Sequence, residues 1–208
     1  MVSKGHELLR LSPVMPVVVI DEVADAVPVA RALLAGGIRV IELTLRTPVA
    51  LEAIERVASE VPEIVLGAGT VTTPEQAKQA ADAGAKFLVT PGCTERVLEA
   101  AFATGLPFLP GAGTVSEAMR LAEQGLTALK FFPAEPSGGV AYLKAIAGPL
   151  PQLEFCPTGG ITAQSAASYL ALSTVGCVGG SWLTPKDALA AKDFDRITAL
   201  AQEAAALA

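Results

Sequence analysis

Short apolar runs alternate along the chain with longer segments in which apolar residues recur every three or four positions. Runs rich in Val and Ile predict buried strands, whereas the recurring spacing predicts amphipathic helices. The expected strands are residues 14–20, 38–45, 64–66, 86–89, 107–109, the run around Lys130, 154–156 and 175–178. The expected helices are residues 25–34, 48–60, 74–83, 95–103, 116–123, 140–147, 163–172 and 194–207, with Asp25 capping the first.

These elements form eight strand and helix units spaced roughly 20 to 25 residues apart. Parallel βαβ winding requires such spacing, and eight units close most simply into a barrel. A doubly wound open sheet is the alternative, but it would be expected to show fewer units and a G-x-G-x-x-G turn, which we do not find. We therefore predict an α/β fold, a (β/α)8 TIM barrel forming a single domain over residues 1–208, with a short N-terminal helix within residues 1–12.

Charge and hydropathy narrow the classes of function. The net charge of −6, the pI near 4.9 and the lack of a basic cluster argue against general binding of nucleic acid. The apolar runs are too short to span a bilayer, so no membrane association is expected. The N-terminus lacks the pattern of a signal peptide, and the expected location is the cytoplasm.

The cysteines and the single histidine limit the chemistry further. Cys93, Cys156 and Cys177 are odd in number and widely spaced, which argues against a disulfide framework or a zinc site and favours reduced thiols. His6 is the only histidine and lies in the polar N-terminal segment, which argues against histidine-based catalysis and most transition-metal sites. Proton transfer must then use a carboxylate, a lysine, a tyrosine or water.

Lys130 is the residue around which the candidate chemistry is organised. It lies inside a short apolar run between Gly125 and Pro133, which is typical of a buried strand. Removing a lysine from water favours its neutral amine, which can attack a carbonyl and form an imine. Alternatively, Lys130 could sit at the end of the strand and extend its ammonium group to solvent. The run by itself does not decide between the two.

Other polar residues fall at the carboxyl ends of expected strands, where barrels of this type have their sites. Glu42 is an acid inside an apolar strand, so it is either half of a structural salt bridge or a proton shuttle beside Lys130. Arg46 follows it and could bind a substrate carboxylate or simply be solvated. Thr70 could help to bind an anion or only cap a helix.

Paired glycines follow the last two expected strands. One loop has Gly159 and Gly160, and the other has Gly179 and Gly180 followed by Ser181. Backbone amides in these two loops of a barrel commonly bind phosphate, and ordinary tight turns are the alternative.

Five segments together resemble the 2-keto-3-deoxy-6-phosphogluconate (KDPG) aldolase family, which often also acts on 4-hydroxy-2-oxoglutarate (KHG). The resemblance covers nearly the whole chain, and its most specific segments are residues 42–46, 67–71, 129–135, 157–161 and 179–182. It implies a class I aldolase of the Entner-Doudoroff pathway, with no metal and no cofactor besides a covalent imine. The implied substrate is a phosphorylated 2-keto-3-deoxy sugar acid that is cleaved to pyruvate and glyceraldehyde 3-phosphate.

The resemblance also implies roles for individual residues. Lys130 would form the Schiff base, and Glu42 would be the acid and base. Arg46 and Thr70 would hold the pyruvate part, and Pro91, Phe132 and Thr158 complete the candidate substrate-binding set. The implied phosphate-binding residues are Gly159, Gly160, Gly180 and Ser181. The implied assembly is a homotrimer.

One loop departs from the family pattern. Residues 111–114 read Gly-Ala-Gly-Thr where bulkier residues are expected. Small side chains there could loosen the loop or widen the opening of the barrel, so the substrate preference stays open. Two other functions also stay open. A sugar-phosphate isomerase could use Glu42 as a base and Lys130 as a plain cation, and a non-catalytic barrel could merely bind a phosphorylated metabolite.

Overall fold

The computed structural model describes residues 5–207 as an α/β protein. Its strands are β1 (Val14–Val18), β2 (Val40–Thr44), β3 (Val65–Gly69), β4 (Phe87–Val89), β5 (Phe108–Leu109), β6 (Gly111–Ala112), β7 (Ala128–Phe131), β8 (Glu154–Pro157) and β9 (Val178–Gly180). Its helices are α1 (Gly5–Leu8), α2 (Val23–Ala35), α3 (Ala50–Glu60), α4 (Pro74–Asp82), α5 (Glu95–Thr104), α6 (Val115–Glu123), α7 (Gly139–Ala147), α8 (Ala163–Leu170), α9 (Lys186–Ala191) and α10 (Phe194–Ala205).

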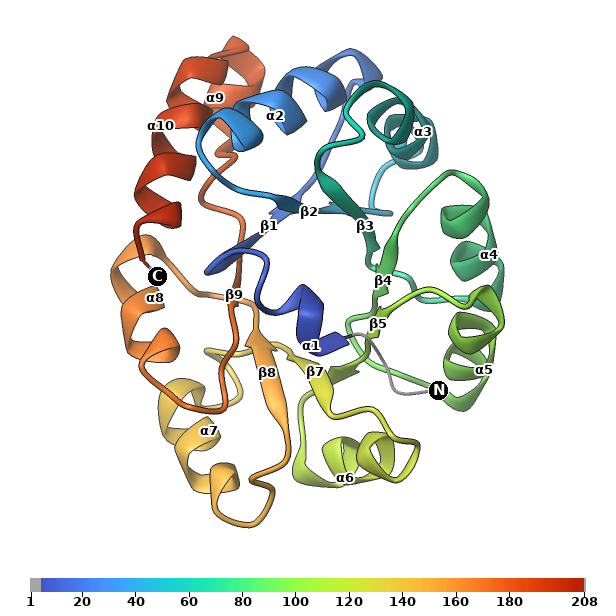
Figure 1. Ribbon diagram of the computed structural model, residues 1–208, viewed down its shortest axis with the longest axis vertical. Helices are drawn as coiled ribbons and strands as arrows, with labels where there is room; N and C mark the ends of the chain where they lie inside the picture. The colour runs from blue at the N-terminus through green and yellow to red at the C-terminus, as the bar shows by residue number, and fades with distance from the viewer. Residues whose placement is uncertain (1–4, 208) are drawn as a thin grey trace.

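The paired strands are all parallel. Six of them form one curled sheet in the order β5-β4-β3-β2-β1-β9, and β6, β7 and β8 form a second sheet. The strands surround the middle of the molecule, and the larger helices lie outside them (Figure 1). Two isolated parallel bridges, Phe155 with Val175 and Thr158 with Gly179, join β8 to the segment that contains β9. The predicted α/β class and parallel winding are therefore confirmed.

The fifth strand is split in two, which the sequence did not predict. Pro110 separates β5 from β6, and a proline has no N–H with which to continue a ladder. Its carbonyl nevertheless accepts a hydrogen bond of 2.9 Å from the Lys130 amide. As a result β5 pairs with β4, whereas β6 pairs with β7.

Two helix predictions also need correction. Helix α2 begins at Val23 with Glu22 in the N-cap position, so Asp25 lies in its first turn and is not its cap. The six-residue helix α9 was not predicted; it lies between β9 and α10.

Two clusters of buried apolar residues form the core. The larger cluster includes buried residues of the strands and of the helices that cover them. The smaller cluster joins α1 and its following residue to inward positions of the strands: Leu8, Leu9, Met15, Val40, Phe87, Val89, Leu109, Ala128, Cys156 and Cys177. It lies in the middle of the ring of strands, where Figure 1 also places α1.

Helix α1 is anchored at the amino ends of β7 and β8. The His6 ring lies 2.5 Å from a Glu154 carboxylate oxygen and 2.8 Å from the Thr127 hydroxyl. Thr127 precedes β7 and Glu154 begins β8. The expected N-terminal helix is therefore present from Gly5, and residues 1–4 lie outside the described part of the chain.

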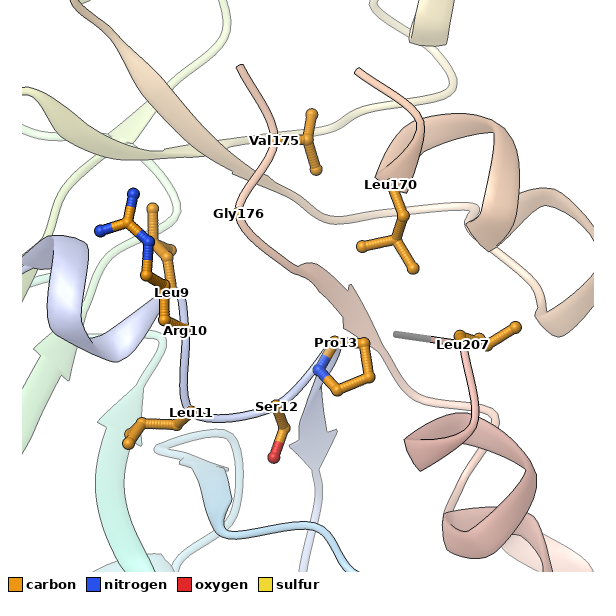
Figure 2. A pocket seen from close by; sticks show the side chains of 9 residues that line it. All are labelled: Leu9, Arg10, Leu11, Ser12, Pro13, Leu170, Val175, Gly176 and Leu207. Carbon is orange, nitrogen blue, oxygen red and sulfur yellow. The ribbon is translucent and has the colours of Figure 1, made fainter. Parts of the chain in front are cut away.

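Two cavities lie at opposite ends of the strands. The first, of about 470 Å³, is at the amino end (Figure 2) and is lined by Leu9, Arg10, Leu11, Ser12, Pro13, Leu170, Val175, Gly176 and Leu207. Arg10 is the only charged residue among these, and its guanidinium already binds Glu154 at 3.2 Å. The second, of about 820 Å³, is at the carboxyl end, and Arg46 and Ser181 are among its lining residues.

Candidate active site

Lys130 and Glu42 form a buried ion pair between opposite sides of the strand ring. The Lys130 Nζ lies 3.0 Å and 3.2 Å from the two carboxylate oxygens of Glu42. The side chains are 5% and 2% exposed, respectively. Lys130 is the third residue of β7 and Glu42 the third of β2, so both point inward from the strands. Lys130 therefore does not extend to solvent.

This pair places an amine within hydrogen-bond distance of a carboxylate. An ion pair removed from water brings a large desolvation penalty, so it is weak evidence for a purely stabilising role. A carboxylate within hydrogen-bond distance of an amine can accept its proton and leave it nucleophilic. The Phe132 ring centroid lies 5.8 Å from the Lys130 Nζ and covers one side of it.

Arg46 and Thr70 lie together beyond the ends of β2 and β3. The Arg46 Nε donates a hydrogen bond of 3.1 Å to the Thr70 hydroxyl. Thr70 has a φ of 59°, a left-handed conformation that is costly for a β-branched residue and typical of functional sites. Arg46 also lines the cavity at the carboxyl end, whose lining does not include Thr70, Lys130 or Glu42.

Pro91 and Thr158 are held by close contacts with glycines. A side chain at Gly111 would overlap the main chain of Pro91, so the small residue there does not widen the mouth at that point. A side chain at Gly179 would overlap the Thr158 hydroxyl, which also lies 3.8 Å from the Cys156 sulfur. Thr158 is buried, and its position depends on the absence of a side chain at residue 179.

Gly179 and Gly180 lie within β9 and not in a loop after it, and the bridge between Thr158 and Gly179 places them beside the loop of Gly159 and Gly160. Gly159 and Gly160 have φ values of 104° and 83°, which favour glycine over any residue with a side chain. Ser181 is exposed and lines the cavity at the carboxyl end. The candidate phosphate-binding residues thus lie together at the same end of the strands as Arg46.

Glu135 and Tyr169 support this loop, and sequence reasoning missed both roles. The Tyr169 hydroxyl donates a hydrogen bond of 2.6 Å to the Glu135 carboxylate, and the Glu135 amide donates to the Gly159 carbonyl at 3.0 Å. A side chain at Gly160 would overlap Glu135. Burial, and then Glu135 itself, raise the pKa of Tyr169 well above its ordinary value, so this hydroxyl stays a donor at neutral pH.

The Tyr169→Phe variant is expected to lose about 0.5–1.5 kcal/mol of free energy of unfolding, because the hydrogen bond from the buried Tyr169 hydroxyl to the exposed Glu135 is lost. Urea denaturation measures this loss. Tyr142→Phe is the matched control, since the Tyr142 ring stacks on Phe131 at 5.2 Å and keeps that contact without its hydroxyl. Equal losses in the two variants would contradict the supporting role of Tyr169.

The three cysteines are free thiols in the structure. Cys156 and Cys177 are buried and in contact with each other, and burial raises the pKa of the Cys93 thiol to about 11. Cys93 therefore stays protonated at neutral pH.

Within residues 5–207, no group of three or more His, Cys, Asp or Glu side chains is placed to hold a metal ion. Among the helices of that same range, none is long and apolar enough to cross a membrane.

Comparison with known proteins identifies the family. The family model of KDPG and KHG aldolases matches residues 6–200. The chain belongs to the KDPG and KHG aldolase family. The predicted resemblance is therefore confirmed.

Individual relatives cover almost the whole chain. The 2-dehydro-3-deoxy-phosphogluconate aldolase of Dickeya dadantii is 54% identical over 98% of this chain and 96% of the relative. The KHG/KDPG aldolase of Escherichia coli strain K12 is 52% identical over 97% of this chain and 95% of its own length.

Solved structures of the family match equally well. A KDPG aldolase from Legionella pneumophila, with pyruvate captured at low pH as a covalent carbinolamine intermediate, has a TM-score of 0.95 and 45% identity, covering 97% of this chain and 98% of that one. The 2-keto-3-deoxy-6-phosphogluconate aldolase of Zymomonas mobilis ZM4 with 3-phosphoglycerate has a TM-score of 0.95 and 47% identity, covering 100% and 98%.

Proposed function

We propose that the protein is a class I aldolase that cleaves 2-dehydro-3-deoxy-6-phosphogluconate to pyruvate and D-glyceraldehyde 3-phosphate. The observation that carries this proposal is the buried contact of 3.0 Å between the Lys130 amine and the Glu42 carboxylate. Relatives about half identical to the chain are named for this activity. Other relatives are named KHG/KDPG aldolase, which supports a second activity, cleavage of 4-hydroxy-2-oxoglutarate to pyruvate and glyoxylate.

The reaction begins at Lys130. Glu42 accepts a proton from the amine, which then adds to the C2 ketone of the substrate and forms a carbinolamine. Glu42 returns this proton to the carbinolamine hydroxyl, which leaves as water and gives a protonated imine; the imine withdraws electrons from the bond between C3 and C4. The related enzyme captured as a pyruvate carbinolamine supports this covalent route.

Cleavage and product release follow from the same two residues. The Glu42 carboxylate takes the proton of the C4 hydroxyl, and the bond between C3 and C4 breaks with its electron pair moving toward the imine nitrogen. The aldehyde leaves, and the remaining enamine accepts a proton at C3 from Glu42. Addition of water then releases pyruvate and regenerates the Lys130 amine, so the water and the proton balance.

The remaining candidate residues position the substrate in this proposal. Arg46 and Thr70 bind the pyruvate carboxylate, because a guanidinium pairs well with a carboxylate and the Arg46 side chain already lies against the Thr70 hydroxyl. Pro91, Phe132 and Thr158 contact the part of the substrate next to Lys130. The phosphate binds the main chain at Gly159, Gly160 and Gly180 and the Ser181 hydroxyl, since the carboxyl end of such strands is a common phosphate site.

The same proposal includes the closed form of the fold and its assembly. The two bridges between β8 and the β9 segment support closure into a (β/α)8 barrel. A single domain over residues 1–208 stays a prediction from the sequence. The family resemblance supports a homotrimer. The cytoplasmic location stays a prediction from the sequence.

Trapping with pyruvate and borohydride tests the function. Reduction fixes any imine on the lysine that formed it, and peptide mass spectrometry locates the adduct. The expected result is an adduct on Lys130 and none on exposed lysines such as Lys144 and Lys186. Folded protein that gives no adduct on Lys130 would favour the isomerase or the non-catalytic barrel.

A further inference from the structure

Strand β3 presents two glycines to the interior beside Glu42. In the parallel ladder Glu42 pairs with Gly67, and Thr44 pairs with Gly69. Residues 67 and 69 lie on one face of β3, whereas Ala68 lies on the other, among the buried residues of the larger core cluster. The wall of the strand ring therefore has two successive inward positions without a side chain.

Each glycine makes room for a different neighbour. A Cβ built at Gly67 would overlap the aromatic ring of Phe87. A Cβ built at Gly69 would overlap the Glu42 side chain at one carboxylate oxygen and at its Cγ. The Glu42 carboxylate therefore occupies the space that a side chain at residue 69 would fill.

Neither glycine is required by its backbone conformation, because neither has the positive φ seen at eight other glycines. Gly69 is buried at the end of β3, with Glu42 as its contact. What residue 69 must provide is space.

We propose that Gly69 is a positioning residue, which acts by leaving room for the Glu42 carboxylate to reach the Lys130 amine. The carboxylate approaches Nζ with both oxygens, at 3.0 Å and 3.2 Å, and it does so from within the volume next to Gly69. A methyl group at residue 69 turns the Glu42 side chain away and lengthens this approach. Glu42 is 1% exposed, so the displaced carboxylate has no nearby solvent into which it can move.

This inference rests on the proposed aldolase mechanism. In that mechanism, displacement of the Glu42 carboxylate slows proton transfer more than imine formation. Imine formation needs the Lys130 amine, whose proton water can also accept, whereas exchange of the C3 protons needs the carboxylate in place. Gly69→Ala is therefore expected to separate the two steps. Borohydride trapping with pyruvate reports the imine, and loss of the pyruvate methyl protons in D2O, followed by NMR, reports proton transfer.

The expected result for Gly69→Ala is a trapped imine on Lys130 with exchange per imine lowered by about tenfold or more, as for a misplaced acid and base. Gly67→Ala is the matched control. It adds the same methyl group two residues away on the same face, against Phe87, and it is expected to lower the melting temperature but keep the exchange per imine. Normal exchange per imine in Gly69→Ala would overturn the proposal.

A second pair of variants tests the proposal even if Gly69→Ala alone does not fold. Glu42→Ala removes the atoms that the new methyl group would overlap, so Gly69→Ala is expected to lower the melting temperature much less in that background. An equal loss of melting temperature with and without the Glu42 side chain would also overturn the proposal. Wild-type protein that forms no imine would instead refute the proposed function.

Discussion

Replacing Lys130 by methionine is expected to lower aldol cleavage on the order of 10⁵-fold or more, because the variant lacks the amine that forms the imine. Methionine has a similar length and no charge, so the packing of β7 is kept. The rate of pyruvate release from 2-dehydro-3-deoxy-6-phosphogluconate measures the loss, and trapping with borohydride should give no adduct at residue 130.

The same variant should also be less stable, which requires a control. Glu42 is 1% exposed, and without Lys130 its carboxylate is buried and unpaired. Removing one partner of a buried ion pair typically costs about 3–5 kcal/mol of free energy of unfolding. The double variant Lys130→Met with Glu42→Gln has no buried charge at either position, and most of the stability should return while cleavage stays absent.

Two outcomes would contradict the role of Lys130. Cleavage within tenfold of wild type in the single variant would rule out an imine on this lysine. A double variant that regains activity together with stability would mean that the first loss came from the fold alone.

The strands and helices were predictable from the sequence where each of them buries one apolar face, because burial leaves a periodic pattern. The apolar runs predicted where the strands lie. The rule that barrel sites lie at the carboxyl ends of strands predicted that Glu42 lies beside Lys130, 88 residues away in the sequence. This worked because a charge inside an apolar strand needs a partner, and closure of the strands around a centre brings inward residues together.

The features that were missed depend on neighbours distant in the sequence. The division of the fifth strand at Pro110 depends on which flanking strand each half pairs with. The bond between Glu135 and Tyr169 joins residues 34 positions apart and follows no periodic pattern.

The glycines show a further limit of sequence reasoning. Their sequence suggested open loops that a ligand can approach. At Gly160 and Gly180, however, the space for a side chain is filled by Glu135 and the Trp182 ring. A glycine in a sequence does not reveal whether a ligand or another part of the chain takes its space.

Replacing Glu42 by glutamine is expected to leave some imine formation but to slow proton transfer by about 10²- to 10⁴-fold. Glutamine has the same shape and fits beside Gly69, but its amide cannot take the proton of the C4 hydroxyl or return it to C3. The imine is measured by borohydride trapping with pyruvate, and proton transfer by exchange of the pyruvate methyl protons in D2O. Cleavage of the six-carbon substrate should fall by a similar factor, because it depends on the same carboxylate.

Glu42→Asp separates the chemistry of the carboxylate from its position. Aspartate keeps the carboxylate but is one methylene shorter, so the contact of 3.0 Å with Lys130 is lengthened. Its exchange rate should lie between those of wild type and Glu42→Gln, since a misplaced base is better than none. If glutamine left the exchange rate unchanged, water alone would carry the proton, and Glu42 would be only the buried counter-charge of Lys130. A gradation from glutamate through aspartate to glutamine is instead expected because proton transfer requires both the carboxylate and its reach across the strand ring.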